Sequence, residues 1–370
     1  MINNPIQEII SSTYGNDFSH LTYPQQKTVN DICQCRTPAL GGTRYFCNDC
    51  GHTRYVFRSC GNRSCPCQAF KQAKWVDARS AEVVDVTYYH AVFTVPCTLN
   101  DVIYHHQREC YDLLFQAVSK TLLEMGADKR HMNAKLGFMC FLHTWGSTIL
   151  YHPHMHVILL GCGLSKSGKL VYPKGKGNYM LPVKAMSRLF RGKFLDGLKK
   201  FNFSESVDYT DLYSKDWVVY MKDSVSGPDH VIEYLGRYTT RIAISNSRIV
   251  SHTSEEVTFS YKDYRDNCTK KTMSLSSQEF SRRFMMHVLP RGFRKIRFYG
   301  FLSNRSKEAS LCMIRNLLKC EKREASLKDK SAAQIMLIKY GHDCSKCSNC
   351  GSSNISITNV LPDTRFWSSA

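Results

Sequence analysis

The segment His152-Pro153-His154-Met155-His156-Val157-Ile158-Leu159-Leu160 places three histidines at alternate positions directly before an apolar run. Residues two apart in a β-strand point to the same face, so a strand here would present the imidazoles of His154 and His156 side by side. Two imidazoles on one face of a buried strand can begin a metal site. The alternative is a half-exposed strand with ordinary polar histidines, and the segment by itself favours that alternative.

The composition indicates a folded, basic protein. Its 370 residues are 43% hydrophobic, which suffices for two or three domains with a sizeable core. Lysine and arginine outnumber aspartate and glutamate by 50 to 31, and the resulting charge of +19 favours a polyanionic partner such as nucleic acid. No signal peptide is evident, and no apolar run approaches the roughly 20 residues of a membrane helix. We therefore expect a cytoplasmic protein without membrane attachment.

Cysteines in the N-terminal region are spaced like zinc ligands. The chain has 17 cysteines, several in tight pairs, which without a secretory signal indicates metal binding rather than disulfides. Cys47-x2-Cys50-Gly51 has the form of a zinc knuckle, and Cys60 with the Cys65-x-Cys67 pair could supply its second half. The tight Cys65-x-Cys67 spacing leaves the fourth ligand open. The predicted zinc ligands are Cys35, Cys47, Cys50, Cys60, Cys65 and Cys67, with His20 as an alternative participant.

A further cysteine group lies near the other end of the chain. Cys344-x2-Cys347-x2-Cys350-Gly351 is half of a zinc knuckle and shares only the CxxCG fragment with the N-terminal region. Cys312 and Cys320 could supply partners, although their spacing is poor evidence. A reduced tail without metal is the alternative interpretation.

Alternating apolar stretches predict strands around the histidines. Residues 88–95 (YYHAVFTV), 137–145 (GFMCFLHTW) and 154–160 are typical of strands, and the last two are close enough to form an antiparallel pair. Such a pair would bring His143 beside His154 and His156, so His143 or His90 could complete a metal shell. His152 shares their parity but precedes Pro153 at the entrance of the strand, and we do not expect it to be a ligand.

Two tyrosines lie four residues apart in a predicted helix. The run at 230–244 (HVIEYLGRYTTRIAI) contains Tyr234 and Tyr238, whose hydroxyl groups would leave the same helix face. Arg237 and Arg241 accompany them. Gly236 costs helix propensity, which suggests a close approach at this position. Taken alone, a tyrosine pair of this spacing is usually a packing feature.

Basic residues alternate with aromatic residues at 280–299 (FSRRFMMHVLPRGFRKIRFY). Arginine for phosphate and aromatic faces for base stacking is the composition that a groove for single-stranded nucleic acid needs. The candidate DNA-binding residues are Arg282, Arg283, Arg291, Arg294 and Arg297, with Arg237 and Arg241 from the tyrosine helix. A basic, glycine-rich loop at 165–179 has the same character, although a solvated loop explains it equally well.

As a set, these motifs resemble the rolling-circle insertion-sequence transposases of the HUH type with two tyrosines, the IS91 family. The resemblance covers roughly residues 30–305. It is carried by residues 35–42 (CRTPALGG), 47–51 (CNDCG), 59–66 (SCGNRSCP), 143–146 (HTWG), 152–156 (HPHMH), 234–239 (YLGRYT) and 288–293 (VLPRGF). Relatives generally have CxxC where this chain has Cys65-Pro66-Cys67, and many have a histidine where Thr240 stands.

The resemblance implies an α+β protein with an HUH endonuclease fold, which is a central antiparallel sheet of ferredoxin-like character with packed helices. It implies a zinc-binding, DNA-recognition module at residues 1–75 and a tyrosine nuclease domain at 76–305. A basic helical tail would follow at 306–370, with a possible second cysteine cluster.

The resemblance also implies a mechanism. His154 and His156, completed by a third side chain such as His143, would hold Mg²⁺ or Mn²⁺, and Tyr234 or Tyr238 would attack a DNA phosphate to give a 5′-phosphotyrosine. The partner would be single-stranded or hairpin DNA of transposon ends, in the bacterial cytoplasm at the nucleoid, and Zn²⁺ would be structural. A replication initiator or relaxase of the same chemistry is one alternative, and a zinc-containing DNA-binding protein that has lost catalysis is another.

Overall fold

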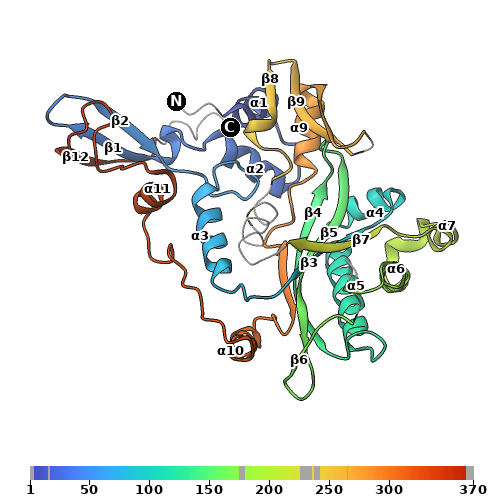
Figure 1. The fold of residues 1–370 in the computed structure, drawn as a ribbon. Coiled ribbons are helices and arrows are strands. Elements are labelled where there is room, and N and C mark those ends of the chain that lie inside the picture. Colours follow the sequence, from blue (N-terminus) through green and yellow to red (C-terminus); the bar gives the residue numbers. More distant parts are fainter. Residues whose placement is uncertain are drawn as a thin grey trace.

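The computed structural model describes residues 4–15, 17–174, 180–225, 236, 242–264 and 266–363. At its centre is a six-stranded sheet in which the strands follow the order β11-β4-β5-β3-β7, with β6 paired to β5 (Figure 1). The members are β3 (Tyr88–Thr94), β4 (Lys135–Trp145), β5 (Tyr151–Leu164), β6 (Leu170–Val171), β7 (Val219–Val225) and β11 (Ile296–Gly300). Every pairing in it is antiparallel, as the sequence predicted.

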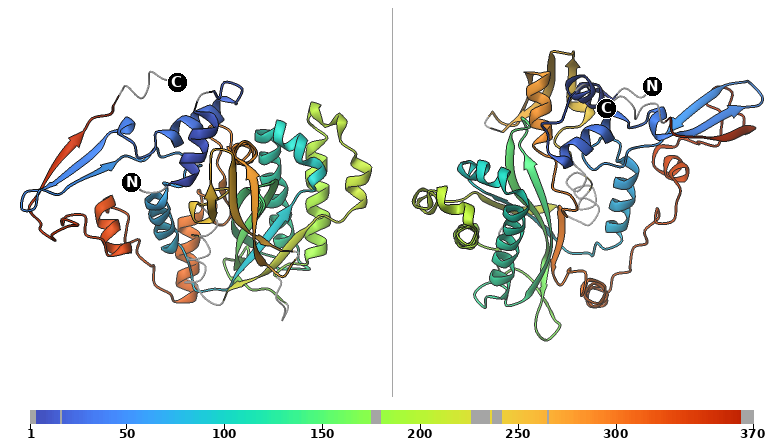
Figure 2. Two further views of the ribbon diagram at one scale, coloured as in Figure 1. Left: turned by 90° about the horizontal axis from the view of Figure 1, so that it is seen from above. Right: turned by 180° about the vertical axis from the view of Figure 1, so that it is seen from behind.

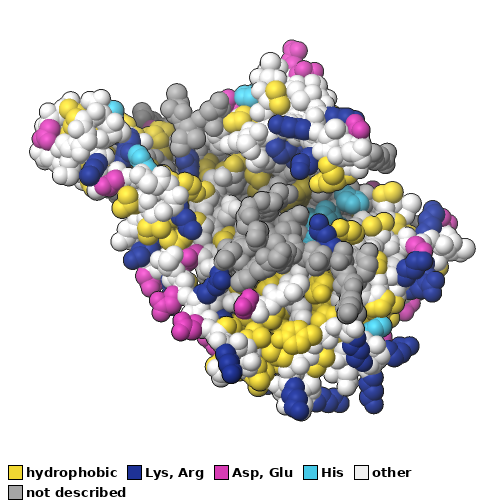
Figure 3. Space-filling view, in the orientation of Figure 1, with side chains coloured by type: hydrophobic (Ala, Val, Ile, Leu, Met, Phe, Trp, Pro, Cys, Tyr) yellow, Lys and Arg dark blue, Asp and Glu magenta, His cyan; other side chains and the backbone are white. Residues whose placement is uncertain are grey.

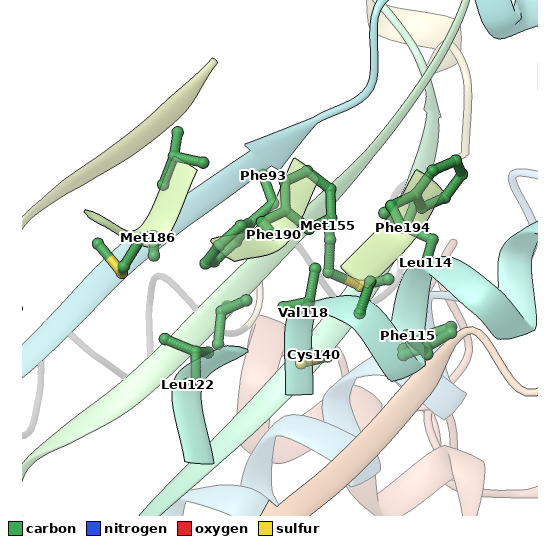
Figure 4. Close-up of a cluster of buried hydrophobic side chains, with 14 of the residues drawn as sticks. Phe93, Leu114, Phe115, Val118, Leu122, Cys140, Met155, Met186, Phe190 and Phe194 are labelled. Carbon is green, nitrogen blue, oxygen red and sulfur yellow. The ribbon is translucent and has the colours of Figure 1, made fainter. Parts of the chain in front are cut away.

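Helices cover one face of this sheet. The long α5 (Gln107–Ala127) and α6 (Val183–Leu198) lie along it, with α4 (Asn100–His105) and α7 (Tyr209–Ser214) nearby (Figures 1 and 2). Alternate strand residues such as Phe93, Cys140 and Met155 point into this layer and meet Phe115 and Phe190 of the helices (Figure 4). Since this face buries large aromatic and aliphatic side chains, it holds the main core.

The opposite face of the sheet carries the histidines. Tyr88, Phe141 and Ile158 belong to a separate buried cluster on that face, where they contact residues of α10 (Lys307–Leu318). His90, His143, His154 and His156 have the same strand parity as these residues, so their side chains leave the sheet on the side away from α5 and α6. The sheet is thus apolar along both faces, with one polar interruption at the histidines.

A second core joins residues that are far apart in the sequence. Helix α1 (Pro5–Tyr14) and α2 (Tyr23–Cys33) pack with α9 (Ser277–Met285) and a sheet of order β10-β9-β8. Ile6, Ile9 and Ile32 are fully buried there together with Phe259 and Phe280. The strands are β8 (Ile249–His252), β9 (Glu256–Asp263) and β10 (Thr269–Ser276). Because α1 and α2 share this core with residues 249–285, residues 1–75 do not pack as one unit.

A third sheet, of order β12-β1-β2, lies away from the main body (Figures 1 and 2). It consists of β1 (Gly42–Cys47), β2 (Thr53–Phe57) and β12 (Ile355–Val360), so the C-terminal segment pairs with the N-terminal hairpin. The segment at 306–370, predicted to be a helical tail, contains α10 and α11 (Ala332–Tyr340) but then adds this strand. The remaining elements are α3 (Ala69–Ser80), η1 (Pro38–Leu40), η2 (Cys97–Leu99), η3 (Asn202–Ser206) and η4 (Asn246–Arg248).

Within the described ranges, no helix has the length and apolar character needed to cross a membrane.

Candidate active site

Three histidines converge on one point of the central sheet. His154 and His156 lie on β5, and His143 on β4 is the direct cross-strand partner of His154. One nitrogen of each ring lies within 4.8 Å of the others, and the Nε2 atoms of His154 and His156 are 3.0 Å apart. Directly paired positions in an antiparallel sheet bring side chains this close, so the register of β4 against β5 builds the cluster. Histidines form a visible group in the space-filling view, with lysine and arginine side chains nearby (Figure 3).

Hydrogen bonds orient two of these rings. Nδ1 of His154 lies 2.7 Å from the carbonyl oxygen of His152, to which it must donate, so Nε2 of His154 keeps its lone pair. Nδ1 of His156 lies 2.9 Å from Nε2 of His90 on β3. If His156 donates in this bond, its Nε2 likewise keeps its lone pair, on the side of His154. The backbone of His152 therefore contributes to the site although its ring is not in the cluster, and His152 lies inside β5 rather than at a loose entrance.

Burial lowers the pKa of two of the imidazoles, those of His154 and His90. It lowers the pKa of His154 to about 4, and burial together with the nearby charge of Lys222 lowers the pKa of His90 to about 4. A neutral imidazole is the form that binds a metal. Trp145 covers His143 with a ring stacked at 4.7 Å. The donor set fits a divalent ion, and all-imidazole coordination suits Mn²⁺ better than Mg²⁺, which prefers oxygen.

The six cysteines predicted as zinc ligands are divided between two clusters. Cys60, Cys65 and Cys67 meet Cys35, one of the candidates for the open fourth position, and His20 is not in this group. Cys47 and Cys50 instead meet Cys347 and Cys350. The prediction that the Cys47 knuckle combines with Cys60 is therefore wrong. Strand β1 runs away from the Cys35 cluster and carries the knuckle to its far end.

The first cluster has the dimensions of a zinc site. The Sγ atoms of Cys60 and Cys67 are 3.7 Å apart, close to the edge of about 3.8 Å expected for a tetrahedron with zinc–sulfur bonds of about 2.3 Å. The backbone amide of Cys60 donates to Sγ of Cys35 over 3.4 Å, and that of Asn62 donates to Sγ of Cys60 over 3.4 Å. The unusual Cys65-x-Cys67 spacing is thus compatible with a complete set of four thiol groups.

Several arginines predicted to bind DNA have partners within the protein. Arg282 and Arg283 on α9 both pair with Glu279, and Arg283 also donates to the carbonyl of Thr148. Arg297 on β11 pairs with Asp112 of α5. Of the five arginines in this run, Arg282, Arg291 and Arg294 are exposed, and the last two lie in the loop before β11. DNA binding by this region therefore stays a prediction.

Two of the aromatic residues of the same run are buried in the cores and cannot stack on bases. Phe284 and Phe293 are 2% and 4% exposed and belong to the cores. The run is also interrupted, since α9 ends at Met285 and β11 begins at Ile296. Aromatic residues can alternate with basic residues both in a buried core and in a nucleic-acid groove. The pattern alone does not distinguish the two, which is why the sequence suggested a groove.

A half-buried lysine beside Trp145 was not predicted as a site residue. Lys295 lines a small pocket together with Arg63, Trp145 and His287. Burial and the charge of Arg63 lower the pKa of Lys295 to about 8. Trp145 forms one wall of this pocket and also stacks on His143, so this side chain is shared by the pocket and the histidine cluster. In the sequence, Lys295 is one basic residue among several, with nothing to mark it as half-buried.

The predicted catalytic residues Tyr234 and Tyr238, with Arg237 and Arg241, lie outside the described residues. Gly236 is described, and its carbonyl accepts a hydrogen bond of 2.9 Å from Gln72 of α3. A Cβ at Gly236 would lie 3.6 Å from the side chain of Val76, which is ordinary contact. Among the described residues, no closer neighbour of this Cβ is found, and the close approach suggested by the glycine stays a prediction.

Two family models match the chain. One is described as "Transposase zinc-binding domain" and matches residues 6–95, and the other is described as "Putative transposase" and matches residues 137–310. The second match contains β4, β5 and the three histidines. The first contains α1, α2, the Cys35 cluster and the Cys47 knuckle.

Similar curated proteins bear related names. The chain is 41% identical over 323 residues to "Putative transposase y4qJ" of Sinorhizobium fredii, which covers 82% of this chain and 81% of that protein. It is 27% identical over 299 residues to "Transposase for insertion sequence element IS801" of Pseudomonas savastanoi pv. phaseolicola. That match covers 75% of this chain and 70% of the relative. Among solved structures, the conjugative relaxase TrwC bound to mutant OriT DNA matches 42% of this chain and 68% of its own, with 14% identity and a TM-score of 0.26.

Proposed function

Since this chain belongs to the IS91 family of insertion-sequence transposases, we propose that it cleaves and rejoins single-stranded DNA at the ends of its element through a tyrosine nucleophile. The observation that carries the proposal is the convergence of His143, His154 and His156 on one face of the sheet. The DNA would be single-stranded or hairpin transposon ends, encountered at the nucleoid of a bacterial cell.

His143, His154 and His156 would hold the divalent ion, Mn²⁺ or Mg²⁺. When bound, it supplies Lewis-acid polarisation of a non-bridging oxygen of the scissile phosphate. The carbonyl of His152 and the ring of His90 hold two of the three imidazoles in orientation. Lys295 and Arg63 line the pocket on Trp145, the residue that stacks on His143, and their positive charge would suit the negative charge that develops on the phosphate.

The chemistry of the step follows from the residue types. Tyr234 or Tyr238 loses its phenolic proton and its oxygen bonds to phosphorus, while the bond from phosphorus to the 3′ oxygen breaks. The 3′ oxygen leaves and takes up a proton, giving a free 3′-OH and a 5′-phosphotyrosine. A free tyrosine has a pKa near ~10, so Arg237 and Arg241 would help to favour the phenolate. The phosphotyrosine keeps the bond energy for rejoining, so no ATP is needed.

Two tyrosines allow two strand transfers. One would cleave the first strand while the second accepts the other end of the element, which separates a transposase from an enzyme that only nicks. A replication initiator or relaxase would use the same cluster on a different DNA. A DNA-binding protein without catalysis would retain the cysteines but would have no need for converging histidines.

The test is covalent capture of labelled single-stranded DNA that spans the end of the element, with Mn²⁺ present. We expect a protein–DNA adduct that resists denaturation and is lost when Tyr234→Phe and Tyr238→Phe are combined. Tyr264→Phe, at an exposed tyrosine, is the matched control and should form the adduct normally. The single tyrosine variants then show which residue begins the reaction. If the unaltered protein forms no adduct with its own end sequence, the catalytic proposal is wrong.

A further inference from the structure

The two ends of the chain meet at a second group of four cysteines. Strand β12 pairs with β1 in antiparallel register, with Gly42 opposite Val360 and Cys47 opposite Ile355. This pairing brings Cys347 and Cys350 to the knuckle of Cys47 and Cys50, about three hundred positions earlier in the chain. Cys347 and Cys350 lie outside the residues that either family model matches.

Both halves of this cluster have the same local structure. In each, the amide of the glycine that follows the second cysteine donates to the carbonyl of the first: Gly51 to Cys47 and Gly351 to Cys347, both over 2.9 Å. The two glycines have φ of +70° and +75°, in the left-handed region that favours glycine. Two CxxCG turns of one shape therefore face each other across the β1–β12 pair.

The sulfur positions match a metal site and not a disulfide. Sγ of Cys47 lies 3.6 Å from Sγ of Cys350, and Sγ of Cys50 lies 3.7 Å from Sγ of Cys347. A disulfide brings sulfurs to about 2.05 Å, whereas a zinc ion with four thiolates separates them by about 3.8 Å. All four are free thiols in the structure. Four sulfurs in mutual reach are the ligand set of a closed structural zinc site.

Polar groups around the cluster support thiolate ligands. The backbone amide of Asn349 donates to Sγ of Cys347 over 3.4 Å, and its side-chain amide donates to Sγ of Cys50 over 3.7 Å. Asp49 accepts from the side chains of Ser352 and Asn354, so the two knuckles are also joined by hydrogen bonds outside the sulfurs. Partners of this kind orient metal ligands in known sites.

The sheet around the cluster has almost no hydrophobic core. In β1 only the terminal Gly42 and Cys47 are buried, and no residue of β2 or β12 is buried. Ile357 in β12 is 64% exposed. A sheet this small and this exposed cannot be held by apolar burial alone, and small domains of that kind usually depend on a metal or on disulfides. The cysteine cluster supplies the missing stabilisation.

We propose that Cys47, Cys50, Cys347 and Cys350 form a second structural zinc site, separate from the Cys35 site, which fastens the C-terminal segment to the N-terminal hairpin. The protein then holds two zinc ions per chain, and the module matched as zinc-binding is completed by residues beyond the transposase match. Loss of this site would free β12, while the histidine cluster and the Cys35 cluster would remain, because neither contains a residue of the β12-β1-β2 sheet.

The test is the zinc content of the purified full chain, measured by elemental analysis after removal of loosely bound metal. We expect two zinc ions in the unaltered protein and one in the double variant Cys347→Ser/Cys350→Ser. Cys344→Ser is the matched control: Cys344 precedes Cys347 at the same CxxC spacing but lies outside the cluster, so this variant should keep two. One zinc in the unaltered protein, or two in the double variant, overturns the proposal, as does loss of one zinc in Cys344→Ser.

A second readout covers the case in which the double variant folds poorly. Cys47→Ser/Cys50→Ser alters the same site from the other end of the chain and should give the same single loss. In both double variants, hydrogen exchange should accelerate in β1 and β12 while β4 and β5 stay protected. Exchange that is unchanged in β12 contradicts the proposal. These measurements need neither DNA nor Mn²⁺, so their outcome is independent of the tyrosine chemistry.

Discussion

His90 shows how one residue outside the metal cluster can define it. Its ring lies 2.9 Å from Nδ1 of His156 and is stacked nearly parallel to that ring, at 11°. A neutral His90 can accept the Nδ1 proton of His156 and so direct the lone pair of His156 toward the ion. His90 would then act as a positioning residue and not as the metal ligand that the sequence allowed.

We predict that His90→Ala weakens Mn²⁺ binding by about 10- to 100-fold, the usual effect of removing such a partner. The Mn²⁺ concentration that gives half-maximal adduct should rise by this factor, with near-normal adduct formation at saturating Mn²⁺. His105→Ala, at an exposed histidine, is the control. An unchanged Mn²⁺ dependence would mean that His90 only fills space.

His287 offers a residue-scale prediction about pH. It is buried, its Nε2 donates to the carbonyl of Ile149 over 3.0 Å, and burial lowers its pKa to about 4. Unfolding restores a pKa near ~6.5, so between these values the unfolded state binds a proton that the folded state does not. Stability must therefore fall as pH falls from about 6.5 toward 4, by about 1.4 kcal/mol per pH unit from this residue.

We expect His287→Gln to reduce that slope by about this amount between pH 6.5 and 5, measured by urea unfolding at fixed zinc content. The variant will also be less stable at pH 7, but the slope is independent of that offset. A slope equal to that of the unaltered protein would show that His287 is not buried in the neutral form.

At the scale of elements, the side chain of Arg297 joins strand β11 to helix α5. Arg297 pairs with Asp112, and its guanidinium lies 4.1 Å from the ring centre of Phe115 and 5.1 Å from that of Phe293. Arg294, three residues earlier, is exposed before the strand begins. Two arginines that look alike in the sequence therefore have different surroundings: one joins a strand to a helix, and the other faces solvent.

We predict that Arg297→Gln lowers the free energy of unfolding by about 1 kcal/mol, from the lost ion pair and cation–π contacts. Arg294→Gln should leave stability unchanged. It should reduce the slope of the logarithm of the DNA-binding constant against the logarithm of salt concentration by about 1, measured with single-stranded DNA. Each variant is the control for the other in denaturation and salt-titration experiments. An equal effect of the two on DNA binding would argue that Arg297 leaves Asp112 to contact phosphate.

At the scale of the whole molecule, the N-terminal region depends on distant parts of the chain. Helix α1 packs against α9, and Gln25 of α2 donates to the carbonyl of Met285 over 3.0 Å. Arg63, beside the first zinc cluster, donates to the carbonyls of Pro290 and Phe293. The predicted module at residues 1–75 thus shares its core and its hydrogen bonds with residues near 285–293.

We therefore expect a fragment of residues 1–75 with zinc not to fold, since it lacks Phe280 and Phe284 for its helices and Cys347 and Cys350 for its hairpin. Its amide spectrum should be poorly dispersed, and it should bind at most one zinc tightly. The full chain provides the reference. A well-dispersed spectrum with two bound zinc ions would show that the boundary at residue 75 is a real domain boundary.

Local sequence determined the features that depend on neighbours in the chain. His154 and His156 are two positions apart in a strand and so share a face, and the CxxCG pattern determines the shape of each knuckle. Both features follow from the backbone geometry of a few residues. The antiparallel pair around His143 was also predictable, since a short connection between two strands permits little else.

Only the tertiary structure decided which distant groups meet. Cys47 and Cys50 meet their partners because β12 pairs with β1. The CxxCG pattern of a knuckle does not indicate which other cysteines that knuckle will meet. In the same way, the packing of α5 against the sheet decides the surroundings of Phe293, Arg294 and Arg297. Phe293 fills the core instead of stacking on a base, and Arg297, not Arg294, pairs with Asp112. Long-range pairing is set by the total burial and ligand geometry of the folded chain, which no local pattern contains.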